Sequence, residues 1–214
     1  MKTPRNYLRF VFYLIVLIGF SKSFSGSYDE FFTAIKRDHR NTVEELLKRG
    51  FDPNTLDEKG QPGLVLALRN ESYKVAEALI DSAGLHTEAT NPAGETALMM
   101  ASLRGQSQLA ERLLKRGAAV NRPGWSALHY AATAPDETVL GMLLERGALI
   151  DARSPNGTTP LMMAAQYGPS ECVDLLVARG ANAGLRNDLG LSAADFAGRS
   201  GRDGLASALK RRMK

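Results

Sequence analysis

The chain contains few of the residues on which disulfides, metal sites and catalytic dyads depend. Among its 214 residues there is one cysteine, Cys172, which can form no internal disulfide and which we expect to be a packing residue. The three histidines, His39, His86 and His129, lie far apart and lack the paired spacing of a zinc site. No glycine-rich phosphate loop or dinucleotide fingerprint occurs. We therefore expect no cofactor, no metal site and a fold stabilised by packing alone.

Long apolar runs are also absent, apart from one near the N-terminus. Residues 10–20 carry no charge, follow a short basic stretch and precede small residues at alternating positions. This order is typical of a secretory signal peptide, and the run is about half of the ~20 residues that a spanning helix needs. We expect residues 1–25 to be removed after Ser23 or Ser25, and the protein to be exported, either periplasmic or secreted. An uncleaved membrane anchor is the alternative.

The excess of basic side chains belongs to this N-terminal segment. The whole chain has 27 basic and 23 acidic side chains, but four of the basic ones and none of the acidic ones precede Gly26. The remainder is therefore formally neutral, with 23 side chains of each sign. An overall basic charge would favour nucleic acid or anionic lipid, and neither partner is indicated here. We interpret the basic cluster at 210–214 as a solubilising end of the chain.

A short pattern recurs four times in the rest of the chain. In each copy a hydroxyl residue follows a glycine by two positions and opens an apolar stretch. The four hydroxyl residues are Thr96, Ser126, Thr159 and Ser192, spaced by 30, 33 and 33 residues. A leucine-rich stretch that ends in glycine keeps the same step, at Gly50, Gly117, Gly147 and Gly180. This period is typical of stacked helical repeats, each of which buries its apolar face only against its neighbours.

The most regular copy shows how one unit is expected to fold. Thr159 can accept an unpaired backbone N–H at a helix start, and Pro160 suits the first helical position. The pair Ala164-Ala165 gives that helix a thin face, and Gly168 permits a turn into a second helix. Gly180 then suits the C-terminal cap of the second helix. We expect two antiparallel helices followed by a hairpin.

These motifs resemble the ankyrin repeat family, whose first helix begins Thr-Pro-Leu-His and whose second helix ends Leu-Leu-x-x-Gly-Ala. The first motif is matched at 96–99, 126–129 and 159–162, and the second ends in glycine-alanine at 117–118, 147–148 and 180–181. The resemblance covers about Phe31 to the C-terminus. It implies an all-α ankyrin repeat solenoid of about five to six stacked helix-turn-helix units with connecting hairpins. The expected units are 27–56, 57–90, 91–121, 122–151, 152–184 and 185–214, with the first and last as caps.

Two units depart from the regular length. Thr159 lies twelve positions after Gly147, but Ser126 lies only nine positions after Gly117, so one hairpin is three residues short. The earlier, degenerate unit has one extra residue, which we place at 81–84. Trp125 lies in the short hairpin, and the sequence leaves open whether it contacts a partner or fills a gap.

The resemblance implies a monomeric, non-enzymatic module that binds a protein partner on its concave surface. Carried over position by position, the expected contact residues are Trp125, Tyr167, Arg104, Leu103, Glu95, Thr158 and Gln166. Trp125 and Tyr167 are expected at the centre with Arg104 beside them, because aromatic and arginine side chains dominate interface energies. Met100, Tyr130 and Met163 are expected in the core, and His129 is expected to bond within its own helix start. Similarity to bacterial periplasmic ankyrin proteins suggests that the module supports an exported enzyme or neutralises a toxin.

Two further interpretations are carried as alternatives. One is a membrane-tethered ankyrin scaffold that retains residues 1–25. The other is a serine hydrolase using Ser207 and Lys210, which have the Ser-x-x-Lys spacing but lack the companion motifs of that class. Asn70 and Asn156 begin Asn-x-Ser/Thr sequences, which are glycosylated only in a eukaryotic secretory route.

Overall fold

The computed structural model describes residues 26–213, so the expected signal peptide lies outside the described residues. Residues 26–36 form the first helix. The helices that follow are α2 (Arg40–Lys48), α3 (Gly63–Arg69), α4 (Tyr73–Asp81), α5 (Ala97–Leu103), α6 (Ser107–Lys115), α7 (Ala127–Ala131), α8 (Thr138–Glu145), α9 (Pro160–Tyr167), α10 (Ser170–Ala178), α11 (Ala193–Arg199) and α12 (Asp203–Arg212).

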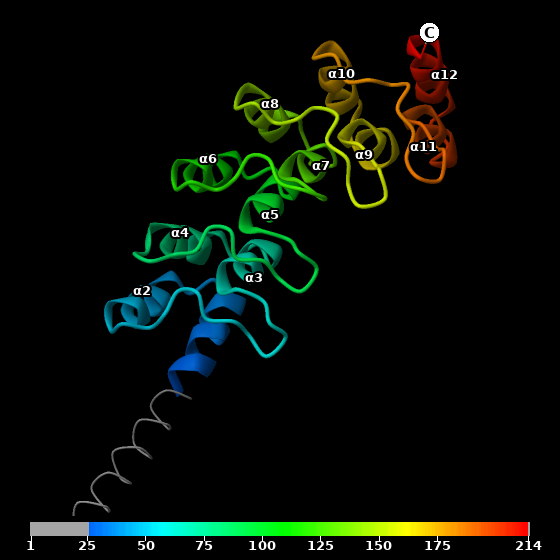
Figure 1. The fold of residues 1–214 in the computed structure, drawn as a ribbon. Helices are drawn as coiled ribbons and strands as arrows, with labels where there is room; N and C mark the ends of the chain where they lie inside the picture. The colour runs from blue at the N-terminus through cyan, green and yellow to red at the C-terminus, as the bar shows by residue number, and fades with distance from the viewer. Residues whose placement is uncertain (1–25, 214) are drawn as a thin grey trace, which may run out of the picture.

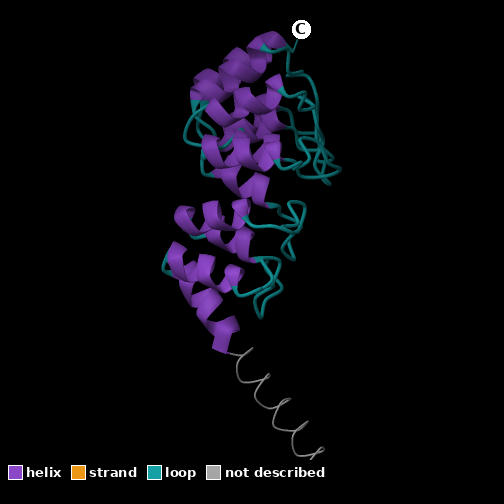
Figure 2. Cartoon of the chain, turned by 90° about the vertical axis from the view of Figure 1, so that its left-hand side faces the viewer, coloured by secondary structure: helices purple, strands orange, loops and turns teal. Residues whose placement is uncertain are grey.

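These helices form six stacked pairs that follow a curved path (Figure 1). The second helices α2, α4, α6, α8 and α10 lie on the outer side of the curve, and the first helices lie on the inner side. The loops between the pairs, which we call fingers, project together from one side of the stack (Figure 2). Over residues 26–213 the only β-structure is two isolated bridges, Leu56 with Pro62 and Thr90 with Thr96. The predicted all-α repeat solenoid is confirmed.

The first helices from α5 onward all begin with a reciprocal cap, but the residue that completes it varies. The side chain of the third helical residue accepts the backbone N–H of the capping residue. The accepting atoms are the sulfur atoms of Met99 (3.4 Å) and Met162 (3.4 Å), the imidazole of His129 (3.2 Å) and the carboxylate of Asp195 (2.8 Å). Three different chemical groups therefore perform one structural role at equivalent positions.

A continuous core follows the stack because small residues let the helices approach closely. A Cβ atom at Gly63 would lie 2.9 Å from the ring of Phe31, and one at Gly168 would lie 2.2 Å from the carbonyl oxygen of Ala132. Cys172 is fully buried, as expected of a packing residue. This burial raises the pKa of its thiol to about 12. Leu161 is also fully buried.

The last unit carries a polar residue at a position that is apolar in the inner units. Lys210 stands in α12 where Leu114, Leu144 and Val177 stand in α6, α8 and α10. Those three apolar residues are partly buried against the core, whereas Lys210 is exposed. A polar outer face is what a terminal repeat needs for solubility.

Side chains tie each finger to the next one. The residue four positions after each terminal glycine accepts a backbone N–H from the following unit. The pairs are Asn54 with His86 (2.7 Å), Glu88 with Ala119 (3.0 Å), Asn121 with Leu149 (2.9 Å) and Asp151 with Asn182 (3.0 Å). On the outer helices, ion pairs join Arg40 to Glu77, Arg112 to Asp81, Arg146 to Glu111 and Arg179 to Glu145.

The extra residue of the degenerate unit lies where the spacing predicts it. Helix α4 ends at Asp81, and two residues separate it from Gly84, which has φ +73°. In the unit after it, α6 ends at Lys115 and one residue separates it from Gly117. The insertion is therefore absorbed in the turn, and the helices on either side keep their packing.

Candidate protein-binding face

We define the concave face as three positions in each unit: the residue before the helix-start cap and the two residues after the alanine pair of the first helix. The residues are Gln61, Arg69 and Asn70, then Glu95, Leu103 and Arg104, then Trp125, Thr133 and Ala134, then Thr158, Gln166 and Tyr167, and finally Leu191, Arg199 and Ser200. They lie on the inner side of the curve, at the base of the fingers and the ends of the first helices (Figure 1).

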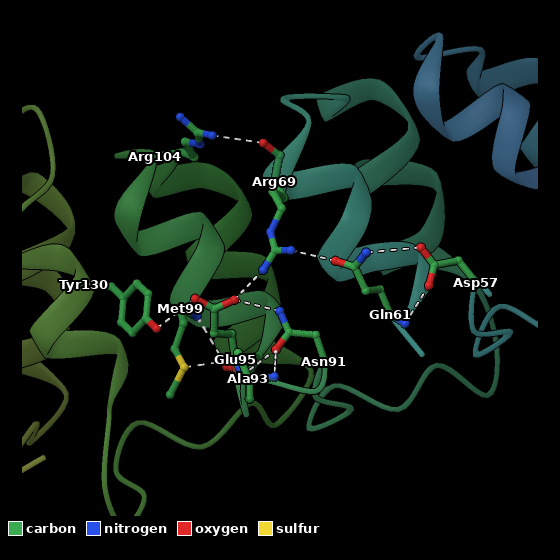
Figure 3. A network of polar contacts seen from close by, with 10 residues as sticks. Asp57, Gln61, Arg69, Asn91, Ala93, Glu95, Met99, Arg104 and Tyr130 are labelled. Carbon is green, nitrogen blue, oxygen red and sulfur yellow. Dashed lines mark hydrogen bonds and ion pairs between the residues drawn. The ribbon is translucent and has the colours of Figure 1, made fainter. Parts of the chain in front are cut away.

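In the N-terminal half of this face the side chains bond to one another (Figure 3). The Glu95 carboxylate pairs with Arg69 and accepts hydrogen bonds from Asn91 (2.6 Å) and from the Tyr130 hydroxyl (3.0 Å). Arg69 also donates to Gln61 (2.6 Å). Burial raises the pKa of Glu95, but these hydrogen bonds and the Arg69 charge outweigh it, so its pKa lies below the usual value. Glu95 is therefore an ionised anchor of this network.

Arg104 is tied to the preceding unit. Its guanidinium donates to the carbonyl oxygen of Arg69 (2.9 Å) and lies 3.0 Å from the carboxylate of Glu71. Leu103, its neighbour, is partly buried and packs against the core. The structure thus gives Glu95, Leu103 and Arg104 partners within the chain.

The short finger at 118–125 lacks the turn that the other fingers share. In each of the other fingers one turn residue donates its N–H to the carbonyl four residues later, and its own carbonyl accepts from a glycine N–H. These turn residues are Asp57, Asn91, Ser154 and Asn187. No backbone bond of this kind forms within 118–125. Asn121 bonds to Gly147 (2.8 Å) and Leu149 (2.9 Å) of the next unit, as Asn54 bonds to Gly84 and His86. The short finger therefore loses the turn and keeps the bridge between units.

Trp125 packs over its own unit. Its ring contacts His129 edge-on at a centroid distance of 5.2 Å and Tyr130 at 6.5 Å, and it is partly buried against the core. No ring contact joins it to Tyr167 anywhere in residues 26–213. The structure therefore places Trp125 against His129 and Tyr130 of its own unit, with part of its surface still accessible.

Thr158 is a correction to the expected contact set. Its side chain is buried, with 2% of its surface exposed, so it does not present itself to a partner. Its backbone carbonyl faces Nε2 of His129 at 3.0 Å. The sequence could not reveal this, because the same position before a helix cap is partly exposed at Gln61, Glu95, Trp125 and Leu191 and buried at Thr158.

His129 has a structural role, as the helix-start motif predicts. A carbonyl can only accept, so Nε2 carries the proton toward Thr158 and Nδ1 accepts from the Ser126 N–H (3.2 Å). The ring is fully buried. Burial lowers the pKa of His129 below its usual value, and the bond to the Thr158 carbonyl opposes this only in part.

The neutral state of His129 predicts a pH dependence of stability. Below about pH 6.5 the unfolded chain binds a proton that the folded chain resists, so the free energy of unfolding should fall by up to about 1.4 kcal/mol per pH unit. His129→Met, which introduces the residue found at the equivalent positions 99 and 162, should flatten this slope between pH 6.5 and 5. Urea unfolding at several pH values measures it. Equal slopes in both proteins would mean that His129 is not the titrating group.

The C-terminal half of the concave face is the more accessible part. Tyr167, at the end of α9, has 64% of its surface exposed, and Gln166 beside it is partly exposed. Arg199, at the equivalent place in α11, is exposed and has no ion-pair partner among residues 26–213. The expected contact set omitted Arg199, although the pair Ala197-Gly198 could have indicated it as the degenerate alanine pair of the last unit.

The three residues expected in the core are buried or partly buried. Met100 is 3% exposed. Met163 and Tyr130 are partly buried and pack against the core, while the Tyr130 hydroxyl reaches Glu95. Burial raises the pKa of this hydroxyl, so Tyr130 is the hydrogen-bond donor to the Glu95 carboxylate.

The structure gives the hydrolase alternative no supporting geometry. Ser207 and Lys210 are both exposed on α12, and no hydrogen bond joins their side chains. Within residues 26–213 no group of three or more histidine, cysteine, aspartate or glutamate side chains is arranged to hold a metal ion. Nor does any helix of that part of the chain have the length and apolar character needed to cross a membrane.

Two hollows lie at opposite ends of the stack. The larger, about 540 Å³, is formed by the first helix, the first finger and α3. It lies far from Trp125 and Tyr167. The other, about 510 Å³, lies between α11 and α12 and includes Leu191 and Arg199 of the concave face. Only the second adjoins the accessible half of that face.

The chain belongs to the ankyrin repeat family. Models of tandem ankyrin repeats match residues 31–123, 83–154 and 143–197. Ankyrin repeats form a protein-binding scaffold, and their relatives are in general interaction modules and not enzymes.

Several known proteins are similar over most of the chain. An ankyrin repeat-containing protein of Treponema pallidum is 30% identical over 179 residues, which are 80% of this chain and 58% of that protein. The rat ankyrin repeat and SAM domain-containing protein 6 is 30% identical over 153 residues, 68% of this chain but 17% of that protein. This chain thus spans only part of these relatives.

Two solved structures share the fold. One is a chain in the complex of a predatory endopeptidase from Bdellovibrio bacteriovorus with an immunity protein, with 27% identity, a TM-score of 0.72 and coverage of 86% of this chain and 97% of that one. The other is the ankyrin repeat domain of Bcl-3, with 29% identity, a TM-score of 0.66 and coverage of 85% and 81%.

Proposed function

We propose that this protein is an exported, non-enzymatic module that binds another protein through the C-terminal half of its concave face. One observation carries the proposal. At equivalent positions, Arg104 is bonded to the preceding unit, whereas Tyr167 has 64% of its surface exposed and no side-chain hydrogen bond within residues 26–213.

The energetics of interfaces favour this half. A few large aromatic and arginine side chains usually carry most of the binding energy. Tyr167 and Arg199 are of these types and are exposed, and the accessible part of Trp125 lies one unit away from Tyr167. In the N-terminal half a partner would have to break the bonds between Arg69, Glu95 and Tyr130 before it could use those groups.

A more specific candidate function is to neutralise an exported enzyme or to support one. The likeness to a chain in an endopeptidase–immunity protein complex supports this candidate, because it covers 97% of that chain. Under this proposal the partner is a hydrolytic enzyme and this protein is its binding partner without catalytic activity of its own. Export is proposed from the order of basic, apolar and small residues in 1–25.

Photo-crosslinking tests the proposed binding face. A benzophenone amino acid in place of Tyr167 should give one discrete protein adduct in cells of the source organism. The same group in place of Ala178, which is exposed on the outer helix α10 of the same unit, is the matched control. With the captured partner purified, Tyr167→Ala should raise Kd about thirtyfold, or about 2 kcal/mol.

Two results would contradict the proposal. Adducts from position 178 and none from 167 would place binding on the outer surface. Normal binding by a folded Tyr167→Ala, Trp125→Ala double variant would exclude the concave face as the binding site. The intact mass of the recovered protein tests export, since a chain that begins near Phe24 or Gly26 is expected and a full-length chain in the membrane fraction would favour the tether.

A further inference from the structure

The neutral charge of the stack conceals a strong asymmetry along its length. Residues 26–100 contain 13 acidic and 8 basic side chains, whereas residues 101–214 contain 10 acidic and 15 basic ones. The two halves therefore carry formal charges of −5 and +5. Such a separation orients an approaching charged partner. The accessible half of the concave face lies in the basic part.

Several cations of the last two units are already engaged. Arg153 lies 3.7 Å from Asp188, and Arg186 lies 3.5 Å from Asp195. The guanidinium of Arg202 donates to three carbonyl oxygens at the end of α9, at 2.8 to 3.1 Å. Arg199, three residues earlier, has no such partner and is exposed. It is the concave-face cation that remains available in this part of the structure.

Arg199 borders a hollow and lies at the end of α11, which packs on the helix that ends in Tyr167. Helices α9 and α11 pack on each other, and Arg202 fixes the end of α11 against the end of α9 near Tyr167. On its other side Arg199 borders the hollow of about 510 Å³. Four residues of its lining are small or apolar, namely Leu191, Ala194, Gly198 and Ala206, and the others are polar or charged.

The acidic groups of this hollow leave the cations in excess. Asp195 accepts hydrogen bonds from the Ser192 N–H (2.8 Å) and hydroxyl (2.6 Å) and also faces Arg186. Asp203 occupies the first turn of α12, where the helix dipole favours a carboxylate. Arg199 and Lys210, by contrast, are both exposed. The site therefore suits a ligand that brings carboxylates together with one apolar side chain.

We propose that the surface formed by Tyr167, Arg199 and the adjoining hollow binds an acidic segment of a partner protein. A carboxylate of the segment pairs with Arg199, because a guanidinium matches the geometry of a carboxylate with two parallel hydrogen bonds. An aliphatic or aromatic side chain beside it occupies the hollow, and the segment runs across the Tyr167 ring. This inference rests on the proposed function and specifies the chemistry of the partner.

Selection from a displayed library of random 12-residue peptides tests the inference on the whole exported protein. The selected peptides should contain aspartate or glutamate next to leucine, phenylalanine or a similar residue. For one such peptide, fluorescence anisotropy should show Kd at least about tenfold higher for Arg199→Glu. Lys48→Glu, an exposed lysine on α2 with the same change in charge, should alter Kd by less than about twofold.

A second variant separates loss of binding from loss of the fold. A side chain at Gly198 has space, since its Cβ would lie 3.9 Å from Ala206. Gly198→Leu should fill the hollow and leave the helix at least as stable, because leucine favours helix over glycine. A rise in Kd of at least about tenfold with an unchanged or higher Tm is expected.

Several outcomes would overturn the inference. These are peptides that are neutral or basic, no selected peptide at all, or binding that survives both Arg199→Glu and Gly198→Leu. If the protein self-associates and Arg199→Glu abolishes this, the ligand of the surface would be a second copy of the chain. If the protein binds vesicles that contain phosphatidylglycerol and Arg199→Glu abolishes this, the ligand would be a lipid surface. A crosslink from position 167 to a partner without an acidic segment would leave the proposed function standing and this inference wrong.

Discussion

Leu161→Ala is expected to lower the free energy of unfolding by about 2–5 kcal/mol. The side chain is fully buried in α9, in the fifth of the six pairs, so its removal loses burial and leaves a cavity. Each unit is stabilised by its neighbours, so the loss is expected to affect the adjoining pairs as well. Urea unfolding followed by circular dichroism gives the shift in midpoint.

Leu189→Ala is the matched control for this change. Leu189 has 75% of its surface exposed, so the same substitution should change stability by less than about 0.5 kcal/mol. A midpoint that does not move in Leu161→Ala would show that the inward face of α9 is assigned wrongly.

Gly168→Ala should be among the most damaging single-methyl additions in the chain. The new Cβ would lie 2.2 Å from the carbonyl oxygen of Ala132 and 2.9 Å from the Cα of Ala164. Both are backbone atoms, and the first belongs to the neighbouring unit, so relief of that contact requires the two units to move apart. We expect a loss of about 3 kcal/mol or more, at the upper end of the overpacking range.

Gly204→Ala provides a control of opposite sign. Gly204 lies in α12 with no atom within 4 Å of its added Cβ, so alanine there should leave stability unchanged or raise it by up to about 1 kcal/mol. Thermal unfolding of the two variants side by side decides the matter. A stable Gly168→Ala protein would contradict the close approach of α7 and α9.

The half of the concave face that a partner can use was not evident in the sequence. Position-by-position comparison treats Glu95, Thr158 and Tyr167 alike as contact residues, because each lies at a recurrent place in its unit. In the structure Glu95 is held by Arg69 and Tyr130, Thr158 is covered, and Tyr167 is exposed. These differences arise from partners in neighbouring units, 26 and 35 residues away in the case of Glu95.

The sequence by itself determined the repeat, the helix starts and the place of the irregular finger. These features are local, because a cap, a terminal glycine and an apolar stripe each act within a few residues of themselves. A fixed period then implies stacking, since no single unit can bury its apolar face alone.

Only the tertiary structure decided how the short finger is accommodated and which side chains remain available. Within residues 26–213 the short finger keeps its bridge from Asn121 to Leu149 without a turn, Trp125 packs on His129, and Arg199 has no ion-pair partner while Arg186 and Arg202 have partners. These outcomes depend on distances between side chains that the period does not specify. The pairing of side chains across a stack is a property of its three-dimensional spacing, and the sequence pattern records only the order of the units.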